Sequence, residues 1–283
     1  MKVANVSGRL HLITSAGTAV DVEQASGARF TADVQSAYDR WAELVAFAAD
    51  IAPGHPLERQ VSDEDLSNPV PAPRQVFAIG LNYADHAAES NFVVPETPTV
   101  FTKFPTCLTG PRGDIVLPPG GHVDWEVELV VVIGRRAERV SEEDAWSYVA
   151  GVTVGQDLSE RRLQLSGSVP QFSMGKSYPR FGPLGPVVVT PDELSDPDDL
   201  ELGALINGEH VQQARTSDMV FSVPALIARL SAVAPLLPGD VLFTGTPSGV
   251  GHARNPQRYL LPGDELASYI HEIGELRHRM VAA

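Results

Sequence analysis

The sequence has very little cysteine and comparatively few basic residues. Among its 283 residues Cys107 is the only cysteine, which excludes an internal disulfide and is typical of a reducing compartment. Lysine and arginine together number 21 against 36 aspartates and glutamates, so the net charge is −15. A chain this acidic is poorly suited to bind nucleic acid or an anionic membrane.

Long apolar runs are also missing. No segment approaches the roughly 20 consecutive apolar residues of a membrane-spanning helix. The first residues contain no long apolar segment of the kind found in secretory leaders. We therefore expect a cytoplasmic protein that does not bind membranes.

Glycine and proline, in contrast, are abundant, with 24 and 23 residues, and 43% of the chain is hydrophobic. This turn-rich composition predicts a β-rich, mixed α/β protein. The length allows one large domain or two unequal ones. A polar, proline-rich passage at 62–73 predicts a division into a small α+β N-terminal domain, residues 1–70, and a larger domain, residues 71–283.

Local patterns predict the main elements. Residues 3–13 and 18–22 predict a hairpin, and apolar residues at helical spacing predict a helix over 34–49. In the larger domain, the predicted elements are strands at 75–80, 149–154, 241–244 and 265–270 and a helix over 224–234.

The stretch DWEVELVVVIG, residues 124–134, predicts a strand that is apolar on both faces. Alternation along a strand places Glu126 and Glu128 on the same face. Two neighbouring buried carboxylates repel each other, and a shared cation removes that repulsion. Oxygen ligands favour Mg²⁺, Mn²⁺ or Ca²⁺ over Zn²⁺. The alternative is a solvated pair of glutamates on an edge strand.

A second candidate pair follows the strand at 75–80. Asn82 could cap a short helix on which His86 and Glu89, three residues apart, face the same way. A carboxylate beside an imidazole fixes its tautomer and makes it a better base, as the activation of water requires. The alternative is an ordinary surface ion pair.

Three further positions are candidates for the same site. Asp157 follows a predicted strand and could be a third metal ligand, or simply the cap of the next helix. Lys176 follows a glycine and could reach a carboxylate or an enolate. Its Gly-Lys-Ser lacks the upstream glycine of a phosphate-binding loop, because Pro170 stands there. The glycine-rich segment 245–251 could hold an anionic group or form a tight turn.

Seven segments taken together carry a family resemblance. They are GLNYADHAAE, DWEVELVVVIG, GQDLSERRLQ, GKSYPRFGPLGP, INGEHVQ, PGDVLFTGTPSGVG and PGDELASYIHEIGEL. In this order, over residues 74–279, the chain resembles the fumarylacetoacetate hydrolase family, in particular its branch of bacterial acylpyruvases and 2-oxo acid hydrolases. The resemblance implies a catalytic domain built as a roll of mixed β-sheets, and a homodimer.

The resemblance also implies a metal centre and a catalytic pair. Glu126, Glu128 and Asp157 would hold one divalent cation per subunit, Mg²⁺, Mn²⁺ or Ca²⁺, with no organic cofactor. His86 and Glu89 would activate water on a lid that orders when substrate binds.

For the substrate, a small anionic 2-oxo acid, the resemblance implies five further residues. Lys176 would stabilise developing negative charge. Arg161, Gln164, Gly245 and Thr246 would contact the substrate.

Three positions depart from the pattern common in the family. Gln156 stands where many relatives have asparagine, and Arg162 and Pro179 stand where many have aspartate. None of these is an implied ligand, but they alter the surroundings of the site, so the substrate cannot be carried over from relatives.

These observations predict a metal-dependent hydrolase that cleaves a C–C bond in a small 2,4-dioxo acid, an acylpyruvate or a diketo-deoxy sugar acid, and releases pyruvate. His86 would take a proton from the water that attacks the C4 carbonyl. The alternatives are an oxaloacetate decarboxylase, an isomerase or hydratase of an unsaturated 2-oxo acid, and a non-catalytic scaffold that binds metal.

Overall fold

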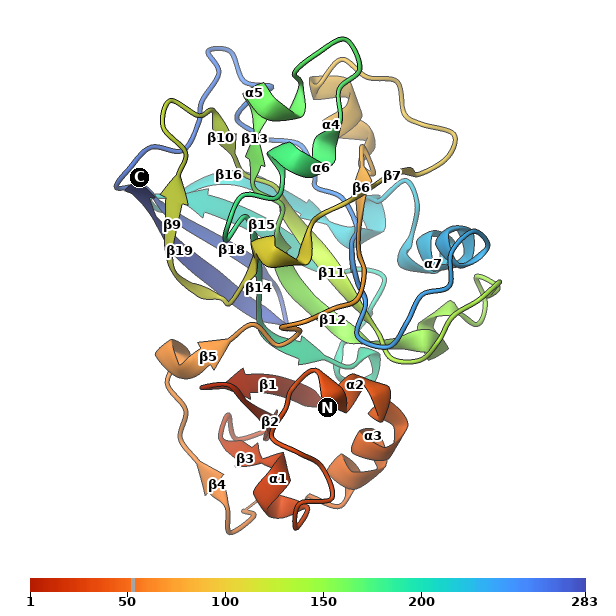
Figure 1. The fold of residues 1–283 in the computed structure, drawn as a ribbon. Coiled ribbons are helices and arrows are strands. Elements are labelled where there is room, and N and C mark those ends of the chain that lie inside the picture. Colours follow the sequence, from red (N-terminus) through yellow and green to blue (C-terminus); the bar gives the residue numbers. More distant parts are fainter. Residues whose placement is uncertain (52–53) are drawn as a thin grey trace.

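The computed structural model describes residues 1–51 and 54–283. A small N-terminal lobe lies beneath a larger body (Figure 1). Strand β1 (Lys2–Val6) of the lobe pairs with β14 (Gly182–Val189) of the body, so one sheet continues from one part into the other. The division at residues 70 and 71 stays a prediction.

The main sheet has twelve strands and is mixed, because β17 and β6 run parallel whereas most other pairs are antiparallel. Ten strands follow one another across it: β4 (Glu58–Arg59), β3 (Ala19–Asp21), β2 (Arg9–Ile13), β1, β14, β12 (Val149–Gln156), β11 (Val127–Ile133), β17 (Val241–Phe243), β6 (Val76–Gly80) and β7 (Thr99–Thr102). In addition, β5 (Leu66–Ser67) pairs with β1, and β8 (Leu108–Thr109) pairs with β14.

A second sheet of five strands packs on the body, and a pair of short strands lies near the site. The five-stranded sheet runs β16 (Glu209–Arg215), β15 (Glu201–Ile206), β18 (Glu265–Ile270), β19 (Gly274–Ala282) and β9 (Arg112–Leu117). The short pair is β10 (Val123–Asp124) with β13 (Ser159–Glu160). This architecture confirms the predicted β-rich, mixed α/β fold.

The helices are short, and α4, α5 and α6 gather at one end of the body (Figure 1). The α-helices are α1 (Val22–Ala25), α2 (Ser36–Asp39), α3 (Trp41–Ala49), α4 (Ala84–Glu89), α5 (Arg161–Gln164), α6 (Phe172–Gly175) and α7 (Val223–Ser231). The 3₁₀ turns are Asp63–Asp65, Pro105–Cys107, Ala145–Tyr148, Pro191–Glu193 and Thr216–Asp218. Within residues 1–51 and 54–283, no helix is long and apolar enough to cross a membrane.

Strand β11 lies between two hydrophobic layers. Leu129 and Val131 belong to one core cluster. Val130 and Val132 belong to the other, which also contains the aromatic side chains of the N-terminal lobe. All four are fully buried. The prediction of a strand that is apolar on both faces is therefore confirmed, and such a strand can hold a charged group only at its end.

Two predictions for the N-terminal lobe need correction. Residues 3–13 are not one strand but the hairpin of β1 and β2, which turns at Ser7 and Gly8 with φ values of 51° and 85°. The predicted pairing with the next strand does occur, between β2 and β3. The helix over 34–49 is interrupted at Arg40, whose φ of −124° is not helical, and becomes α2 and α3.

The linker and the C-terminal end also differ from expectation. Residues 62–73 are not only a linker, since β5 within them pairs with β1. The strand at 265–270 is present as β18, but it is not the last, because β19 follows and pairs with both β18 and β9. The predicted elements at 75–80, 149–154, 241–244 and 224–234 are present as β6, β12, β17 and α7.

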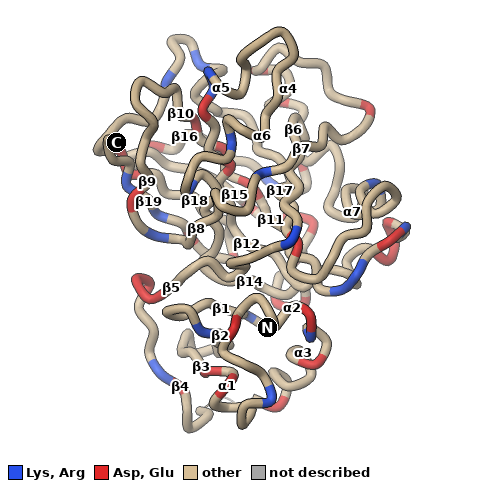
Figure 2. Tube along the Cα trace, in the orientation of Figure 1, with Lys and Arg blue, Asp and Glu red and all other residues tan. Residues whose placement is uncertain are grey.

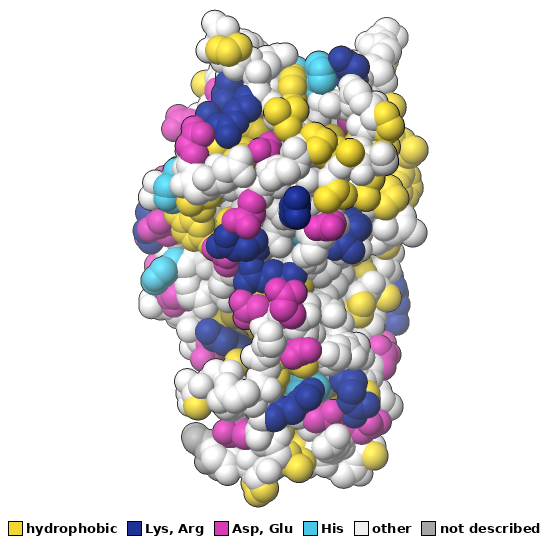
Figure 3. All heavy atoms as spheres, turned by 90° about the vertical axis from the view of Figure 1, so that its left-hand side faces the viewer, with side chains coloured by type: hydrophobic (Ala, Val, Ile, Leu, Met, Phe, Trp, Pro, Cys, Tyr) yellow, Lys and Arg dark blue, Asp and Glu magenta, His cyan; other side chains and the backbone are white. Residues whose placement is uncertain are grey.

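Acidic positions are distributed along the whole chain trace rather than gathered in one tail (Figure 2). On the face seen in Figure 3, side chains of both signs are interspersed, and hydrophobic side chains gather mostly in its upper half. The excess of negative charge therefore does not form a single acidic patch on this face.

Candidate active site

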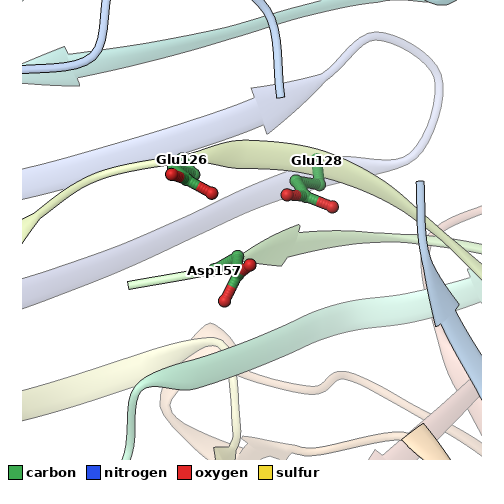
Figure 4. Close-up of side chains that lie close together, drawn as sticks. All are labelled: Glu126, Glu128 and Asp157. Carbon is green, nitrogen blue, oxygen red and sulfur yellow. The ribbon is translucent and has the colours of Figure 1, made fainter. Parts of the chain in front are cut away.

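Three buried carboxylates meet where β11 begins and β12 ends. Glu126 precedes β11, Glu128 is its second residue, and Asp157 directly follows β12. One oxygen from each lies within 4.8 Å of the others, and Figure 4 shows the three carboxylates turned toward one another. Glu128 is only 1% exposed and β11 lies between β12 and β17, so the alternative of a solvated edge strand is wrong.

Backbone hydrogen bonds fix the positions of these carboxylates. The N–H of Asp157 donates to the carbonyl of Glu126 at 2.9 Å, and the N–H of Glu126 donates to the side-chain oxygen of Gln156 at 2.9 Å. The alternative interpretation of Asp157 as a helix cap is wrong, because Glu160 caps α5. The Asp157 carboxylate is therefore directed to the cluster.

Lys176 lies against two of the three carboxylates. Its Nζ is 2.7 Å from Glu126 Oε2 and 2.7 Å from Asp157 Oδ2, and it donates to the hydroxyl of Ser159 at 2.9 Å. The side chain is buried at the end of α6. Lys176 is thus placed where it can stabilise negative charge, and its catalytic role stays a prediction.

Lys103 is a second buried lysine, which the sequence analysis missed. It follows β7 and is 0% exposed. Its Nζ is 2.6 Å from Asp157 Oδ1 and also donates to the carbonyls of Lys176 and Phe181. No sequence motif surrounds it, so only the fold reveals that it belongs to the site.

Arg161, a predicted substrate contact, is held by acidic partners. Its guanidinium is 2.7 Å from Asp124 Oδ2 and 2.7 Å from Glu126 Oε1, and it donates to the side-chain oxygen of Gln164 at 2.9 Å. Asp124 was not singled out from the sequence, although it opens the motif that contains both glutamates. Arg161 therefore orients Glu126 whether or not it also contacts substrate.

The electrostatics of the cluster suit a divalent cation. Burial raises the pKa of Glu128 well above its usual value, and Asp157 and Glu126 raise it further. Burial acts on Glu126 in the same direction, but Lys176 and Arg161 outweigh it and lower the pKa of Glu126 to about 2. A divalent cation would supply the positive charge that favours ionised Glu128, and three carboxylate oxygens are suitable ligands for a hard cation.

His86 and Glu89 form the predicted pair on α4. His86 Nδ1 is 2.8 Å from Glu89 Oε1, and Glu89 Oε2 accepts the N–H of Gly249 at 2.9 Å. Both oxygens of Glu89 are therefore occupied, and α4 is held against the glycine-rich segment. Because Nδ1–H donates to the carboxylate, Nε2 is the nitrogen that carries the lone pair.

Asn82 has a different role from the predicted one. The N-cap of α4 is Tyr83, which makes no side-chain capping bond. The Asn82 amide donates to the carbonyls of Thr244 and Phe221 and accepts the N–H of Phe221. Asn82 thus connects the end of β6 to segments after β17 and before α7, which positions α4 beside the carboxylates.

The glycine-rich segment shapes the site mainly through its backbone. The N–H of Gly245 donates to Glu128 Oε2 at 2.7 Å. The hydroxyl of Thr246 donates to the carbonyl of Val127 at 2.9 Å and accepts from Gln212 at 2.8 Å. Gly245 has a φ of 100°, and a Cβ there would lie 2.7 Å from the Cβ of Asn82, so only glycine fits. Gly245 therefore orients a carboxylate.

One cavity of about 210 Å³ is lined by several of these residues. Among its polar lining residues are His86, Glu126, Lys176, Arg161, Gln164 and Thr246. Its apolar lining includes Ile79, Leu81, Phe92, Phe101, Phe172 and Val250. Of the four predicted substrate contacts, Arg161, Gln164 and Thr246 line this cavity.

Comparisons with known proteins agree with this geometry. The family of the fumarylacetoacetate (FAA) hydrolase C-terminal domain matches residues 75–281. The chain belongs to the fumarylacetoacetate hydrolase family. The family resemblance found in the sequence is thereby confirmed, whereas the narrower likeness to acylpyruvases stays a prediction.

Several proteins are similar to this chain over most of its length. The mitochondrial oxaloacetate tautomerase of Rattus norvegicus is 44% identical over 214 residues, which cover 75% of this chain and 68% of that protein. A putative HpcE protein of Mycobacterium smegmatis is 54% identical, with a TM-score of 0.94 and full coverage of both chains. Maleylpyruvate hydrolase of Sphingobium, solved with manganese(II) and pyruvate, is 29% identical, with a TM-score of 0.81 and full coverage of both.

Of the departures from the usual family pattern, Gln156 contacts a carboxylate residue and Arg162 lies at the surface. Gln156 is fully buried, and its amide nitrogen donates to Ser268 at 2.9 Å while its oxygen accepts from the N–H of Glu126. Arg162 is exposed, donates to the carbonyl of Gly120 and contacts His122. The three carboxylates are buried together with both departures present.

His252 is a further cavity residue that the sequence analysis missed. Its main-chain N–H donates to Asp124 at 2.9 Å, and its Nδ1 lies 2.9 Å from the hydroxyl of Tyr259. Burial lowers the pKa of His252, and the nearby Arg161 lowers it further. A single histidine after a glycine-rich segment gives no sequence signal, so only the fold places it at the cavity.

Proposed function

We propose that this protein is a divalent-metal-dependent enzyme that interconverts the keto and enol forms of a small 2-oxo acid of the oxaloacetate class. The observation that carries the proposal is that His86, paired with Glu89, lines one cavity of about 210 Å³ together with Lys176 and Glu126, one of the three clustered carboxylates. This volume is below the roughly 300–1,000 Å³ of pockets for drug-sized ligands and suits a small acid.

Glu126, Glu128 and Asp157 are the residues that would hold the metal. When bound, Mg²⁺ or Mn²⁺ would supply Lewis-acid polarisation of the 2-oxo group, which acidifies the hydrogens on C3. The three buried donor groups are carboxylates, and their oxygens are the ligands that a hard divalent cation prefers.

His86 would transfer the proton. Its Nε2 carries the lone pair that can take a proton from C3, because Nδ1–H donates to Glu89. Glu89 keeps the imidazole in this tautomer and stabilises the protonated ring. The same nitrogen can return the proton to the substrate, so no other reactant is needed.

Lys176 would stabilise the negative charge that appears on oxygen when the C3 proton leaves. Its ammonium lies in the cavity wall and is oriented by Glu126 and Asp157. The apolar side chains on other parts of the wall limit the access of water. An enolate formed there would therefore meet few competing proton donors.

The relatives support a tautomerase. The Rattus norvegicus protein, 44% identical, bears the name oxaloacetate tautomerase, and proteins of the same name from Bos taurus and Homo sapiens are also 44% identical. Keto–enol conversion needs a metal site and one proton-transfer group, and it needs no attacking water.

Hydrolysis of a 2,4-dioxo acid to release pyruvate is the second candidate. The His86–Glu89 pair could equally take a proton from a water that attacks C4. The Sphingobium relative, named maleylpyruvate hydrolase and solved with manganese(II) and pyruvate, favours this reading. Decarboxylation of oxaloacetate would use the same residues without the water.

Three assays on one preparation distinguish these reactions. Protein stripped with a chelator and reloaded with Mg²⁺ or Mn²⁺ is tested for ketonisation of enol-oxaloacetate, pyruvate release from acetylpyruvate and pyruvate release from oxaloacetate. Metal-restored ketonisation as the fastest reaction supports the proposal. Faster release from acetylpyruvate makes the protein a hydrolase, and faster release from oxaloacetate makes it a decarboxylase. Inactivity in all three assays contradicts the proposal and leaves isomerase, hydratase or scaffold.

A further inference from the structure

In each carboxylate of the cluster, one oxygen contacts a protein donor other than Lys176. Asp157 Oδ1 is 2.6 Å from Lys103 Nζ, and Glu128 Oε2 accepts the N–H of Gly245 at 2.7 Å. Glu126 Oε1 is 2.7 Å from the guanidinium of Arg161. The three donors come from segments far apart in the sequence, yet each contacts a different carboxylate.

Lys103 is held more firmly than an ordinary lysine. It is 0% exposed, and its three ammonium hydrogens have three acceptors, namely Asp157 Oδ1 and the carbonyls of Lys176 and Phe181. An ammonium group has three donors, so none is left over. Moving it away from Asp157 would leave a buried charge with fewer partners, which is costly.

The second oxygens of Glu126 and Asp157 accept from Lys176, which lines the cavity, so a cation that binds them has to displace this ammonium. Asp157 Oδ2 and Glu126 Oε2 both face Lys176 in the centre of the cluster. Glu128 Oε1 makes no hydrogen bond to the described part of the chain. Each carboxylate can therefore offer one oxygen, and none can readily offer both.

We propose that Lys103 is a positioning residue that keeps Asp157 to a single metal-binding oxygen and so makes the site select Mg²⁺ or Mn²⁺ over Ca²⁺. Mg²⁺ requires near-ideal octahedral geometry, whereas Ca²⁺ takes six to eight oxygens and often binds both oxygens of one carboxylate. Three single oxygens leave room for a chelating 2-oxo acid and a water in an octahedron. They give Ca²⁺ none of the bidentate carboxylates that its larger coordination sphere often uses.

The positive charge of Lys103 also favours Mg²⁺ or Mn²⁺ over Ca²⁺. Two lysines and Arg161 lie among the three carboxylates and Asp124, so the cluster is close to neutral before a cation enters. Calcium sites usually gain affinity from the number of carboxylate charges. A buried cation fixed to one ligand lowers that charge and leaves geometry as the main basis of selection.

The inference rests on the metal site of the proposed function, and calorimetric titration tests it without any activity assay. Mn²⁺ and Ca²⁺ are titrated into chelator-treated wild type and Lys103→Met. The wild type should bind Mn²⁺ more tightly than Ca²⁺. Lys103→Met releases Asp157 Oδ1, and the Mn²⁺ preference should fall by about tenfold or more, the usual scale for residues that orient ligands.

Two further variants separate positioning from general damage. Lys103→Gln keeps an N–H donor for Asp157 and removes only the charge, so its Mn²⁺ preference should fall less than that of Lys103→Met. Lys2→Met is the matched control, because it replaces lysine by methionine outside the site. Lys2 donates to the carbonyl of Glu272, and its loss should change neither the Mn²⁺ nor the Ca²⁺ affinity. If Lys103→Met does not fold, Arg161→Met frees Glu126 Oε1 and should lower the preference in the same direction.

The outcomes are distinct for the two proposals. A wild type that binds neither ion contradicts the proposed function. A wild type that binds Ca²⁺ as tightly as Mn²⁺, or a folded Lys103→Met variant with an unchanged preference, overturns the role of Lys103 and leaves the proposed function standing.

Discussion

At the scale of single residues, the strongest constraint on the chemistry is that both carboxylate oxygens of Glu89 accept hydrogen bonds. One oxygen accepts from His86 at 2.8 Å and the other from the N–H of Gly249 at 2.9 Å. The carboxylate thus fixes the histidine tautomer and holds α4 against the glycine-rich segment at once. A carboxamide cannot do both, because only one of its two heteroatoms accepts hydrogen bonds.

We therefore predict that Glu89→Gln lowers kcat about 10- to 100-fold, toward the contribution of a general base. The lost carboxylate would also remove the group that fixes the His86 tautomer. Asp85→Asn is the matched control, since it makes the corresponding change at an exposed position of α4. Equal kcat in Glu89→Gln and wild type would show that the pair is structural.

Residues with a motif were predictable and residues without one were not. His86, Glu89, Glu126, Glu128 and Asp157 stand at spacings that local rules interpret, and the fold brings them together. Lys103 and His252 are single residues in segments without a motif. Lys103 contacts Asp157, which lies 54 positions further along the chain. Such residues become visible only when the tertiary structure is known.

At the scale of elements, apolar patterns predicted the central strands. They did not predict the last strand of the chain or the cap of α4. The alternation in β11 identified a strand buried on both faces. Strand β19 was missed, although GELRHRMVA alternates buried and exposed positions as a half-buried strand does. Asn82 was expected to cap α4, but three tertiary hydrogen bonds outweigh that local preference.

Strand β19 also carries a histidine that makes stability depend on pH. Burial lowers the pKa of His278 to about 4, and the ring donates to the carbonyl of Gly110 at 3.0 Å. In the unfolded chain its pKa is near 6.5, so between pH 6.5 and 4 the unfolded state binds the extra proton. The stabilisation present above pH 6.5 is therefore lost as the pH falls, by about 3 kcal/mol.

His278→Gln should remove that dependence, because glutamine keeps a donor for Gly110 and does not titrate. Urea unfolding at pH 7 and at pH 4.5 measures the free energy of unfolding of both proteins. We expect the wild type to lose more stability than His278→Gln between these two values. An equal loss in both proteins would mean that His278 does not remain neutral in the fold.

At the scale of the whole molecule, one sheet joins both parts of the chain, and the site lies at the end of its central strands. The predicted homodimer, the cytoplasmic location and the division at residue 70 stay predictions. Membership of the family was predictable because seven motifs occur in one order. The choice among reactions was not, because the proposed roles of His86 and Lys176 are compatible with tautomerisation, hydrolysis and decarboxylation alike.

A cation that binds only the folded state should stabilise the entire protein. At a free Mn²⁺ concentration 100 times the dissociation constant, the gain is about 2.7 kcal/mol, which for a chain of this size raises Tm by about 5 °C or more. Differential scanning calorimetry with and without chelator measures the shift. Glu128→Gln, which removes one ligand, should largely abolish it. A shift of equal size in Glu128→Gln would place the metal elsewhere.

In the proposed reaction His86 transfers a C3 proton when metal is bound, and deuterium incorporation at C3 of oxaloacetate in D₂O measures this step. Spontaneous exchange labels both C3 positions alike, whereas a fixed base should label one of them selectively. We predict selective, rapid labelling by the Mg²⁺- or Mn²⁺-loaded wild type. This selective labelling should disappear after chelation, and its rate should fall at least about 100-fold in His86→Gln. Selective labelling that persists in His86→Gln or without metal would contradict the account.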